Sequence, residues 1–221
     1  MRHDVSQRKA VVVLGATGAT GQHVVSTALR RGHHTVALVR RTGTFAPRDG
    51  LEELVWPEVT DTSALTHALS RTLTRTPPGR SVVISALGGA AKGPTTVCTD
   101  GMRSTVAAMR TAGVDRLIAV SAYGVLETHN ASLYSKAVWA GVADRMRDKE
   151  TMEPLITGSG LDWTIVRPPK LSDQDPTGNY RAGTDLPIRL WSSVGRADLA
   201  AFLVDEAETP RYTRAFPRIT R

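Results

Sequence analysis

A glycine-rich turn near the start of the chain limits the possible folds more than any other feature. It consists of Gly15-Ala16-Thr17-Gly18-Ala19-Thr20-Gly21, preceded by an apolar run over residues 10–14 and followed by an amphipathic helical pattern over residues 20–31. Glycines permit a tight turn and close approach of a ligand, and free amides at a helix start attract phosphate. A strand, this turn and a helix in that order predict a pyrophosphate site for a dinucleotide. The alternative is a merely flexible turn.

Strand-like and helix-like segments alternate along the rest of the chain. Strands are expected at residues 10–14, 35–39, 81–84, 116–120 and 162–167, with a third strand before Asp61 whose bounds the pattern leaves open. Helices are expected at residues 20–31, 96–111, 134–157 and 196–206, and another that Ser63 can cap. Such alternation implies parallel strands joined by helical crossovers. We therefore predict an α/β fold, Rossmann-like and doubly wound, with a mainly parallel sheet.

The chain shows no internal repeat and no linker, so a single domain over residues 1–221 is expected. Residues 1–8 are predicted to be flexible. Residues 172–193 form the least regular stretch, and we interpret them as an insertion on the substrate side, where a lid could sit.

Composition excludes several classes of function. The net charge of +7 comes from 23 arginines and five lysines that are scattered along the chain, without a basic tail or an RNA-binding motif, so no nucleic-acid partner is expected. No apolar run approaches the roughly 18–20 residues of a membrane span, and no membrane association is expected. Cys98 stands alone and fits a reducing cytoplasm. The six histidines lack metal-ligand spacing, so we predict no metal, in a cytoplasmic monomer or homodimer.

Ligands of an open parallel sheet bind beyond the carboxyl ends of its strands. Arg40 and Arg41 follow the second strand, where a carboxylate would hold a ribose hydroxyl and an arginine accommodates a 2′-phosphate. These two arginines therefore predict NADP(H) as the cofactor. The alternative is that both are solvated surface charges. Asp61 follows the third strand and could accept from the adenine amino group or cap a helix.

The ends of the later strands supply the remaining candidates. Small or rigid residues that would lie against the dinucleotide follow three of them: Ala86, Leu87, Gly88, Ser121, Ala122, Pro168 and Pro169. A hydroxyl, a phenol and an ammonium come from the same segments, and we take Ser121, Tyr123 and Lys170 as catalytic candidates.

Three segments resemble the atypical short-chain dehydrogenases/reductases, a group of NAD(P)H-binding proteins that includes biliverdin-IXβ reductase (flavin reductase) and NmrA-like proteins. They are the glycine turn at 15–21, Ser-Gly-Leu-Asp-Trp-Thr-Ile-Val-Arg-Pro-Pro at 159–169 and Gly-Arg-Ala-Asp-Leu-Ala at 195–200. Residues 168–178 are similar to the flavin reductase branch in particular. The resemblance covers nearly the whole chain. It implies NADPH across the carboxyl edge of the sheet and an active-site role for Ser121.

Two departures from that pattern bear on the chemistry. Lys170 stands where the flavin reductase branch carries a histidine, and Tyr134 is followed four residues later by Val138 instead of the lysine of standard short-chain reductases. Reduction of an isolated ketone needs a positioned acid, worth about 10²- to 10⁴-fold in rate. A conjugated acceptor delocalises the charge and needs less. We expect Ser121 to orient the acceptor or nicotinamide. Lys170, if partly desolvated, would supply charge or a proton, and is otherwise a surface ammonium.

The sequence thus predicts an NADPH-dependent reductase that transfers hydride to a small conjugated or aromatic acceptor, such as a flavin, quinone, bilin or polycyclic metabolite. Two alternatives remain open at this point. One is a non-catalytic NADP(H) sensor that regulates a partner, and the other is an isomerase or cyclase of secondary metabolism on the same fold.

Overall fold

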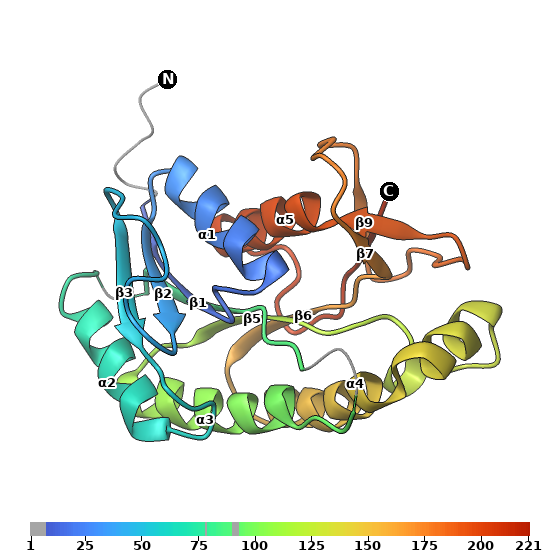
Figure 1. Ribbon diagram of the computed structural model, residues 1–221, viewed down its shortest axis with the longest axis horizontal. Helices are drawn as coiled ribbons and strands as arrows, with labels where there is room; N and C mark the ends of the chain where they lie inside the picture. Colours follow the sequence, from blue (N-terminus) through green and yellow to red (C-terminus); the bar gives the residue numbers. More distant parts are fainter. Residues whose placement is uncertain (1–7, 78, 90–92) are drawn as a thin grey trace.

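A parallel sheet forms the centre of the molecule (Figure 1). The computed structural model describes residues 8–77, 79–89 and 93–221. Within these ranges six parallel strands are hydrogen-bonded in the order β3-β2-β1-β4-β5-β6. The strands are β1 (Ala10–Leu14), β2 (His34–Val39), β3 (Leu51–Val55), β4 (Ser81–Ser85), β5 (Arg116–Val120) and β6 (Asp162–Val166). The strand order reverses between β1 and β4, which is the point where doubly wound sheets bind ligands. The predicted Rossmann-like fold is confirmed.

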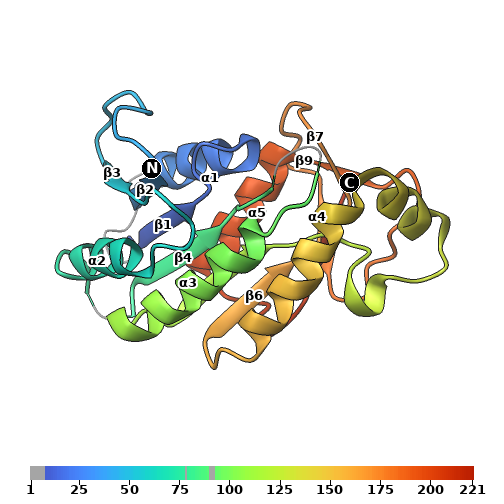
Figure 2. The ribbon, with the colours of Figure 1, turned by 60° about the horizontal axis from the view of Figure 1, so that its bottom comes forward.

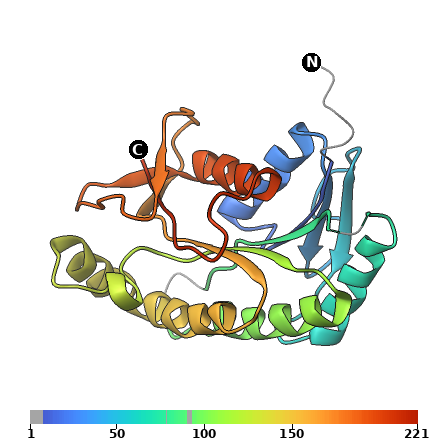
Figure 3. The ribbon, with the colours of Figure 1, turned by 180° about the vertical axis from the view of Figure 1, so that it is seen from behind.

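Helices cover both faces of the sheet. They are α1 (Ala19–Arg30), α2 (Thr62–Leu73), α3 (Val97–Ala112), α4 (Leu133–Thr157) and α5 (Arg196–Glu208). Figure 2 shows α2, α3 and α4 side by side on one face. In the view from behind, α1 and α5 form the layer on the opposite face (Figure 3). No helix of the described ranges combines the length and the apolar character needed to cross a membrane.

The strands are apolar on both faces because both faces are covered. Val11 and Val13 of β1 belong to the core beneath α1 and α5. Val12 and Leu14 belong to the core against α2, α3 and α4. Each such buried side chain stabilises the fold by about 1.5–3 kcal/mol relative to an exposed one. This burial explains why the central strands lack the polar alternation of an edge strand.

Local sequence fixes the helix ends. Gly113 ends α3 in the left-handed conformation, with φ of +73°. Ser132 caps α4 by accepting a hydrogen bond from the Ser135 amide. Non-helical backbone angles at Val142 divide α4, so that its first turns extend past the sheet toward the carboxyl end of β6 (Figure 1). Ser63, the predicted cap of the second helix, lies inside α2, whose N-cap is Asp61.

Short strands extend the structure beyond the carboxyl end of β6. Strand β7 (Lys170–Ser172) pairs in parallel with β9 (Ser193–Gly195), and β8 (Arg181–Gly183) pairs antiparallel with β10 (Arg218–Thr220). The stretch at 172–193 is therefore tied to the C-terminal strand through β8. Its suggested role as a lid stays a prediction. The flexibility expected for residues 1–8 concerns positions that, apart from Arg8, lie outside the described residues.

Candidate functional site

The glycine turn packs closely against the segment that follows β4. Gly15 has φ of +69°, and a Cβ added there would lie 2.7 Å from the Ala86 carbonyl oxygen. A Cβ on Gly21 would overlap the Gly15 carbonyl oxygen. Gly18 is the N-cap of α1. In the described part of the chain no side chain caps this helix, and no acidic residue lies in its first turn. The turn thus leaves helix amides open to an anion.

Among the described residues, three adjoining cavities form one trough along the carboxyl edge of the sheet. The first, about 520 Å³, extends from Arg40 past the glycine turn to residues 86–89. The second, about 420 Å³, shares residues 86–89 with the first and crosses the start of α1 to Ser121. The third, about 450 Å³, shares Ser121 and Leu171 with the second and lies between α4 and the β6–β7 segment. The three cavities are thus continuous along the edge of the sheet where doubly wound folds bind ligands.

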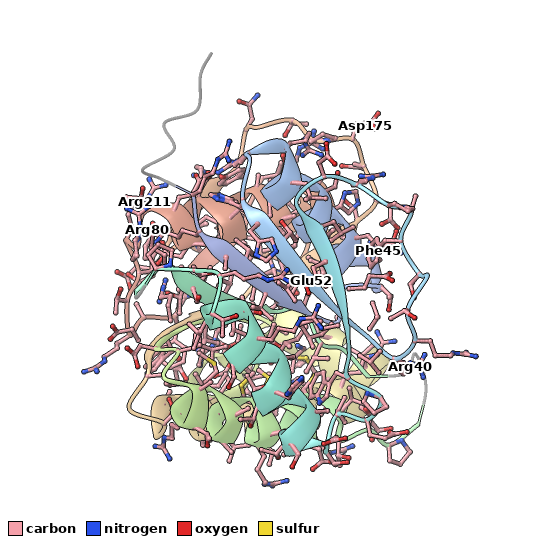
Figure 4. All side chains as sticks on the ribbon, turned by 90° about the vertical axis from the view of Figure 1, so that its left-hand side faces the viewer. Arg40, Phe45, Glu52, Arg80, Asp175 and Arg211 are labelled. Atoms are coloured by element: carbon pink, nitrogen blue, oxygen red, sulfur yellow. The ribbon has the colours of Figure 1, made fainter. Side chains whose placement is uncertain are left out.

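Most of the predicted cofactor residues line this trough. Those that do are Gly15, Thr17, Gly18, Ala19, Thr20, Arg40, Ala86, Leu87, Gly88, Ser121, Ala122, Pro168 and Pro169. Arg40 lies at the carboxyl end of β2, at the rim of the molecule (Figure 4). Along the trough, Arg40 comes first, the glycine turn lies where the first and second cavities meet, and Ser121 lies where the second and third meet.

Three predicted cofactor residues are not brought into the trough lining. Gly21 instead packs against Gly15 and shapes the turn. Arg41 lies in an exposed loop, where its carbonyl accepts from Thr44 Oγ1. Asp61 is the N-cap of α2, since its Oδ1 accepts from the Ala64 amide at 2.8 Å. The helix-capping role of Asp61 is therefore observed, while its contact with the adenine amino group stays a prediction.

Ser121 is the most constrained of the catalytic candidates. The residue is 3% exposed, and its amide donates to the Val166 carbonyl at 2.8 Å, which anchors it to β6. Its Oγ has no hydrogen-bond partner among the described residues, although it borders both the second and third cavities. Buried hydroxyls are normally paired, so a water or a bound ligand is the expected partner of this Oγ.

Two tyrosines line the third cavity beside Ser121. Tyr123 and Tyr134 are buried, and their rings meet edge to face with centroids 5.5 Å apart. Burial raises the pKa of Tyr134 to about 12, with a smaller opposing effect from the backbone of Lys170. The phenol of Tyr134 is therefore protonated at neutral pH and carries a proton that it can donate.

Lys170 lies at the start of β7 and borders the third cavity, but it is exposed. The partial desolvation that its proposed role as a proton source required is not observed. A different lysine, Lys149 of α4, borders both the second and the third cavity. Its Nζ donates to the Val120 carbonyl at 2.9 Å. Arg145 and Arg196 border the same two cavities. Sequence reasoning missed these three cations because none of them directly follows a strand of the six-stranded sheet.

A buried ion pair supports the segments that carry the site. Arg167, 1% exposed, immediately precedes Pro168, and its guanidinium pairs with Glu153 at 2.5 Å. It also pairs with Glu127, which follows the Ser121 loop, and lies 4.1 Å from the centroid of the Phe216 ring. Burial alone would lower the pKa of Arg167, but its bonds to Glu153 and Glu127 raise it above its ordinary value. The two ion pairs of Arg167 thus join α4, the Ser121 loop and the end of β6.

Comparison with a protein-family model agrees with this geometry. The model for a family described as NAD(P)H-binding matches residues 15–210. The chain belongs to this NAD(P)H-binding family. The match begins at the first glycine of the turn, and it extends through α5. A dinucleotide is thus the ligand class of the family, while the choice between NAD and NADP is not fixed by it.

Individual proteins that are similar to this chain carry different descriptions. "Uncharacterized sugar epimerase YhfK" of Bacillus subtilis (strain 168) is 28% identical over 212 residues, covering 93% of this chain and 92% of the relative. Among solved structures, ChuY of Escherichia coli O157:H7, described as an anaerobillin reductase, has a TM-score of 0.79 at 23% identity over 95% of this chain and 96% of that chain. A short-chain dehydrogenase/reductase of Veillonella parvula DSM 2008 in complex with NADP has a TM-score of 0.77 at 18% identity over 96% and 94%. The two structures show that the fold is shared.

Proposed function

We propose that this protein is an NADPH-dependent reductase of a flat, conjugated acceptor. The observation that carries the proposal is the buried Ser121 hydroxyl, which has no partner among the described residues and borders both the second cavity and the largely apolar third cavity. When bound, the reduced nicotinamide supplies a hydride. The similarity in fold to ChuY, described as an anaerobillin reductase, is consistent with this class of acceptor.

Arg40 is proposed to distinguish NADPH from NADH. A guanidinium at the end of β2 can bind a 2′-phosphate through paired hydrogen bonds. We expect Arg40→Gln to weaken NADPH binding about tenfold and to leave NADH binding unchanged. The matched control is Arg41→Gln, because Arg41 is also exposed but does not line the trough. Calorimetric titrations would contradict the assignment if Arg41→Gln had the larger effect on NADPH.

The side chains near Ser121 suit a conjugated acceptor. The Ser121 hydroxyl can donate a hydrogen bond to a carbonyl or ring nitrogen of an acceptor and hold it beside the trough. The protonated phenol of Tyr134 lines the same cavity and can supply a proton to the reduced product. Because conjugation spreads the developing charge, these neutral donors suffice where an isolated ketone would need a stronger acid.

An epimerase reaction, as the description of the Bacillus relative suggests, is less well supported. Epimerisation through an oxidised sugar requires a base that removes a hydroxyl proton. Burial raises the pKa of Tyr134 to about 12, which keeps this phenol in the wrong protonation state for a base at neutral pH. Apolar side chains such as Val138, Val142 and Met146 line much of the third cavity, and this part of its wall offers a sugar no hydrogen bonds.

A Ser121→Ala variant tests the proposal. We expect NADPH affinity to stay within about twofold of the wild type and kcat for acceptor reduction to fall by about tenfold to hundredfold, since a positioned donor is lost. Ser135→Ala is the matched control, because Ser135 also has a buried Oγ without a partner among the described residues but does not line the trough. Equal rates for Ser121→Ala and the wild type would contradict the role of Ser121. No turnover in either protein despite tight binding would instead favour an NADP(H) sensor.

A further inference from the structure

A fourth cavity lies outside the trough, between the short strands that follow β6. Its volume is about 400 Å³, and we name it the C-terminal pocket, defined by its lining: Arg181, Pro187, Arg189, Trp191, Ser192, Ser193, Thr220 and Arg221. None of these residues lines the three cavities of the trough. Leu190, which lies between two of them in sequence, borders the third cavity instead. The segment around Leu190 therefore separates the C-terminal pocket from the proposed acceptor site.

Hydrogen bonds between three chain segments form the floor of this pocket. Thr220 of β10 lies opposite Arg181 of β8 in the antiparallel pair. The Thr220 side chain is buried, and its Oγ1 donates to the Ser193 carbonyl of β9 at 3.2 Å. The Arg221 amide donates to the same carbonyl at 3.1 Å. Figure 1 shows the end of the chain beside β9. The cationic side chains of the pocket are thus attached to backbone that is already fixed.

Three guanidiniums border the C-terminal pocket without a carboxylate side chain as partner. No aspartate or glutamate is among the described residues that line it. Arg221 Nη1 donates to the neutral amide oxygen Oε1 of Gln174 at 2.6 Å. The guanidinium carbon of Arg189 lies 5.9 Å from the centroid of the Trp191 ring. Arg181 forms no side-chain hydrogen bond or ion pair within the described ranges. This concentration of positive charge favours an anionic ligand.

Trp191 adds a flat apolar surface to the same pocket. The residue is 76% exposed, although an indole of this size is usually well buried. Nucleic-acid bases stack on exposed aromatic side chains, and arginine next to such a ring strengthens the contact. The Ser192 Oγ accepts from the Arg189 amide at 3.0 Å, which leaves the hydroxyl proton of Ser192 available to a ligand. The pocket thus combines an aromatic surface with donors for an anion.

We propose that the C-terminal pocket binds a nucleoside polyphosphate, with its phosphates on Arg181, Arg189 and Arg221 and its base on Trp191. Three guanidiniums match the charge of a polyphosphate better than that of a single carboxylate, and each offers paired hydrogen bonds to phosphate oxygens. The volume of about 400 Å³ lies within the range of small-molecule sites. Because the pocket is separate from the trough, this inference does not depend on the proposed reductase function.

ATP, tripolyphosphate and adenosine test the two contacts separately. Each is titrated, without divalent cations, into the full chain carrying one equivalent of NADP⁺, so that the trough is occupied. Calorimetry gives the affinity, and tryptophan fluorescence reports contact with Trp191. We expect one equivalent of ATP to bind, about tenfold more tightly than tripolyphosphate or adenosine. Equal affinities for ATP and tripolyphosphate would overturn the contact with the base, and with it the nucleotide class of ligand.

Two variants assign the binding to the C-terminal pocket. Arg181→Gln/Arg189→Gln should weaken ATP binding at least about tenfold and leave NADPH affinity within about twofold of the wild type. Trp191→Ala should weaken ATP about tenfold but leave tripolyphosphate within about twofold. Arg211→Gln is the matched control, because Arg211 is also exposed but does not line the pocket. Equal ATP affinities for the double variant and the control would contradict the inference.

Three further results would overturn it. The first is the absence of ATP binding to the protein that carries NADP⁺. The second is release of NADP⁺ by ATP, which would place the nucleotide in the trough. The third is an oligonucleotide that depends on the same arginines and binds more tightly with each added base. That result would make the pocket part of a surface for single-stranded nucleic acid instead of a site for a small ligand.

Discussion

Replacement of Gly21 by alanine is expected to abolish measurable NADPH binding, with a loss of affinity of at least about a hundredfold. The added Cβ would overlap the carbonyl oxygen of Gly15, and its other neighbours are backbone atoms of Gly15 and Ala16. Backbone cannot rotate away as a side chain can, so the turn itself must move. Because this turn carries the open amides of α1, its displacement removes the pyrophosphate site. Calorimetric titration with NADPH measures the loss, and circular dichroism checks that the fold persists.

Gly141→Ala is the control for that change. Gly141 lies in α4, and a Cβ there would meet no atom within 4 Å. Gly141 directly precedes the interruption at Val142, so alanine there should change stability by less than about 1 kcal/mol and leave cofactor binding intact. If Gly21→Ala bound NADPH as tightly as Gly141→Ala, the close packing of the turn would be refuted as a requirement for binding.

Replacement of Arg167 by methionine is expected to lower the free energy of unfolding by about 3–5 kcal/mol, the cost of leaving a buried charge without its partner. Glu153 is 0% exposed in the folded protein, and Arg167 pairs directly with it. Methionine fills much of the same volume as arginine. The main change is therefore that the buried Glu153 carboxylate loses the positive charge that balances it. Urea unfolding followed by circular dichroism gives the change in free energy.

Two further variants make the Arg167 result interpretable. Arg214→Met removes an exposed pair with Asp162, whose atoms are 3.7 Å apart, and should change stability by less than about 1 kcal/mol. Adding Glu153→Gln to Arg167→Met removes the stranded charge and should restore part of the lost stability. Equal destabilisation by Arg167→Met and Arg214→Met would show that the buried pair has no special role.

The central strands could be predicted from sequence because burial on both faces requires continuous apolar runs. The bounds of β1 and β5 agree with their predicted ranges. Strand β3 could not be delimited, because it is an edge strand with the sequence Leu-Glu-Glu-Leu-Val. A glutamate of β3 forms hydrogen bonds to a nearby loop: the Glu53 carboxylate accepts from the amides of Gly43, Thr44 and Phe45. Figure 4 shows Glu52 and the loop with Phe45 at this side of the molecule. An edge strand with charged side chains lacks the apolar signal of the central strands.

The candidate site was only partly predictable for a related reason. Glycines, Arg40 and Ser121 follow strands directly, so the topology of the sheet brings them to one edge. Lys149 lies fifteen residues after Tyr134 on a helix that is interrupted at Val142, and only the folded chain places both residues at the same cavity. Helical periodicity cannot be extended across such an interruption.

Stopped-flow mixing of NADPH-loaded wild-type protein with FMN tests the central claim most directly. The near-ultraviolet absorbance of the reduced nicotinamide reports hydride transfer, and the flavin absorbance reports its arrival at the acceptor. A reductase predicts that both signals fall together, with one equivalent of NADPH oxidised for each FMN reduced under anaerobic conditions. NADPH that stays bound and reduced in the presence of FMN, a bilin dicarboxylate and a quinone would contradict the reductase and leave a protein that only binds the cofactor.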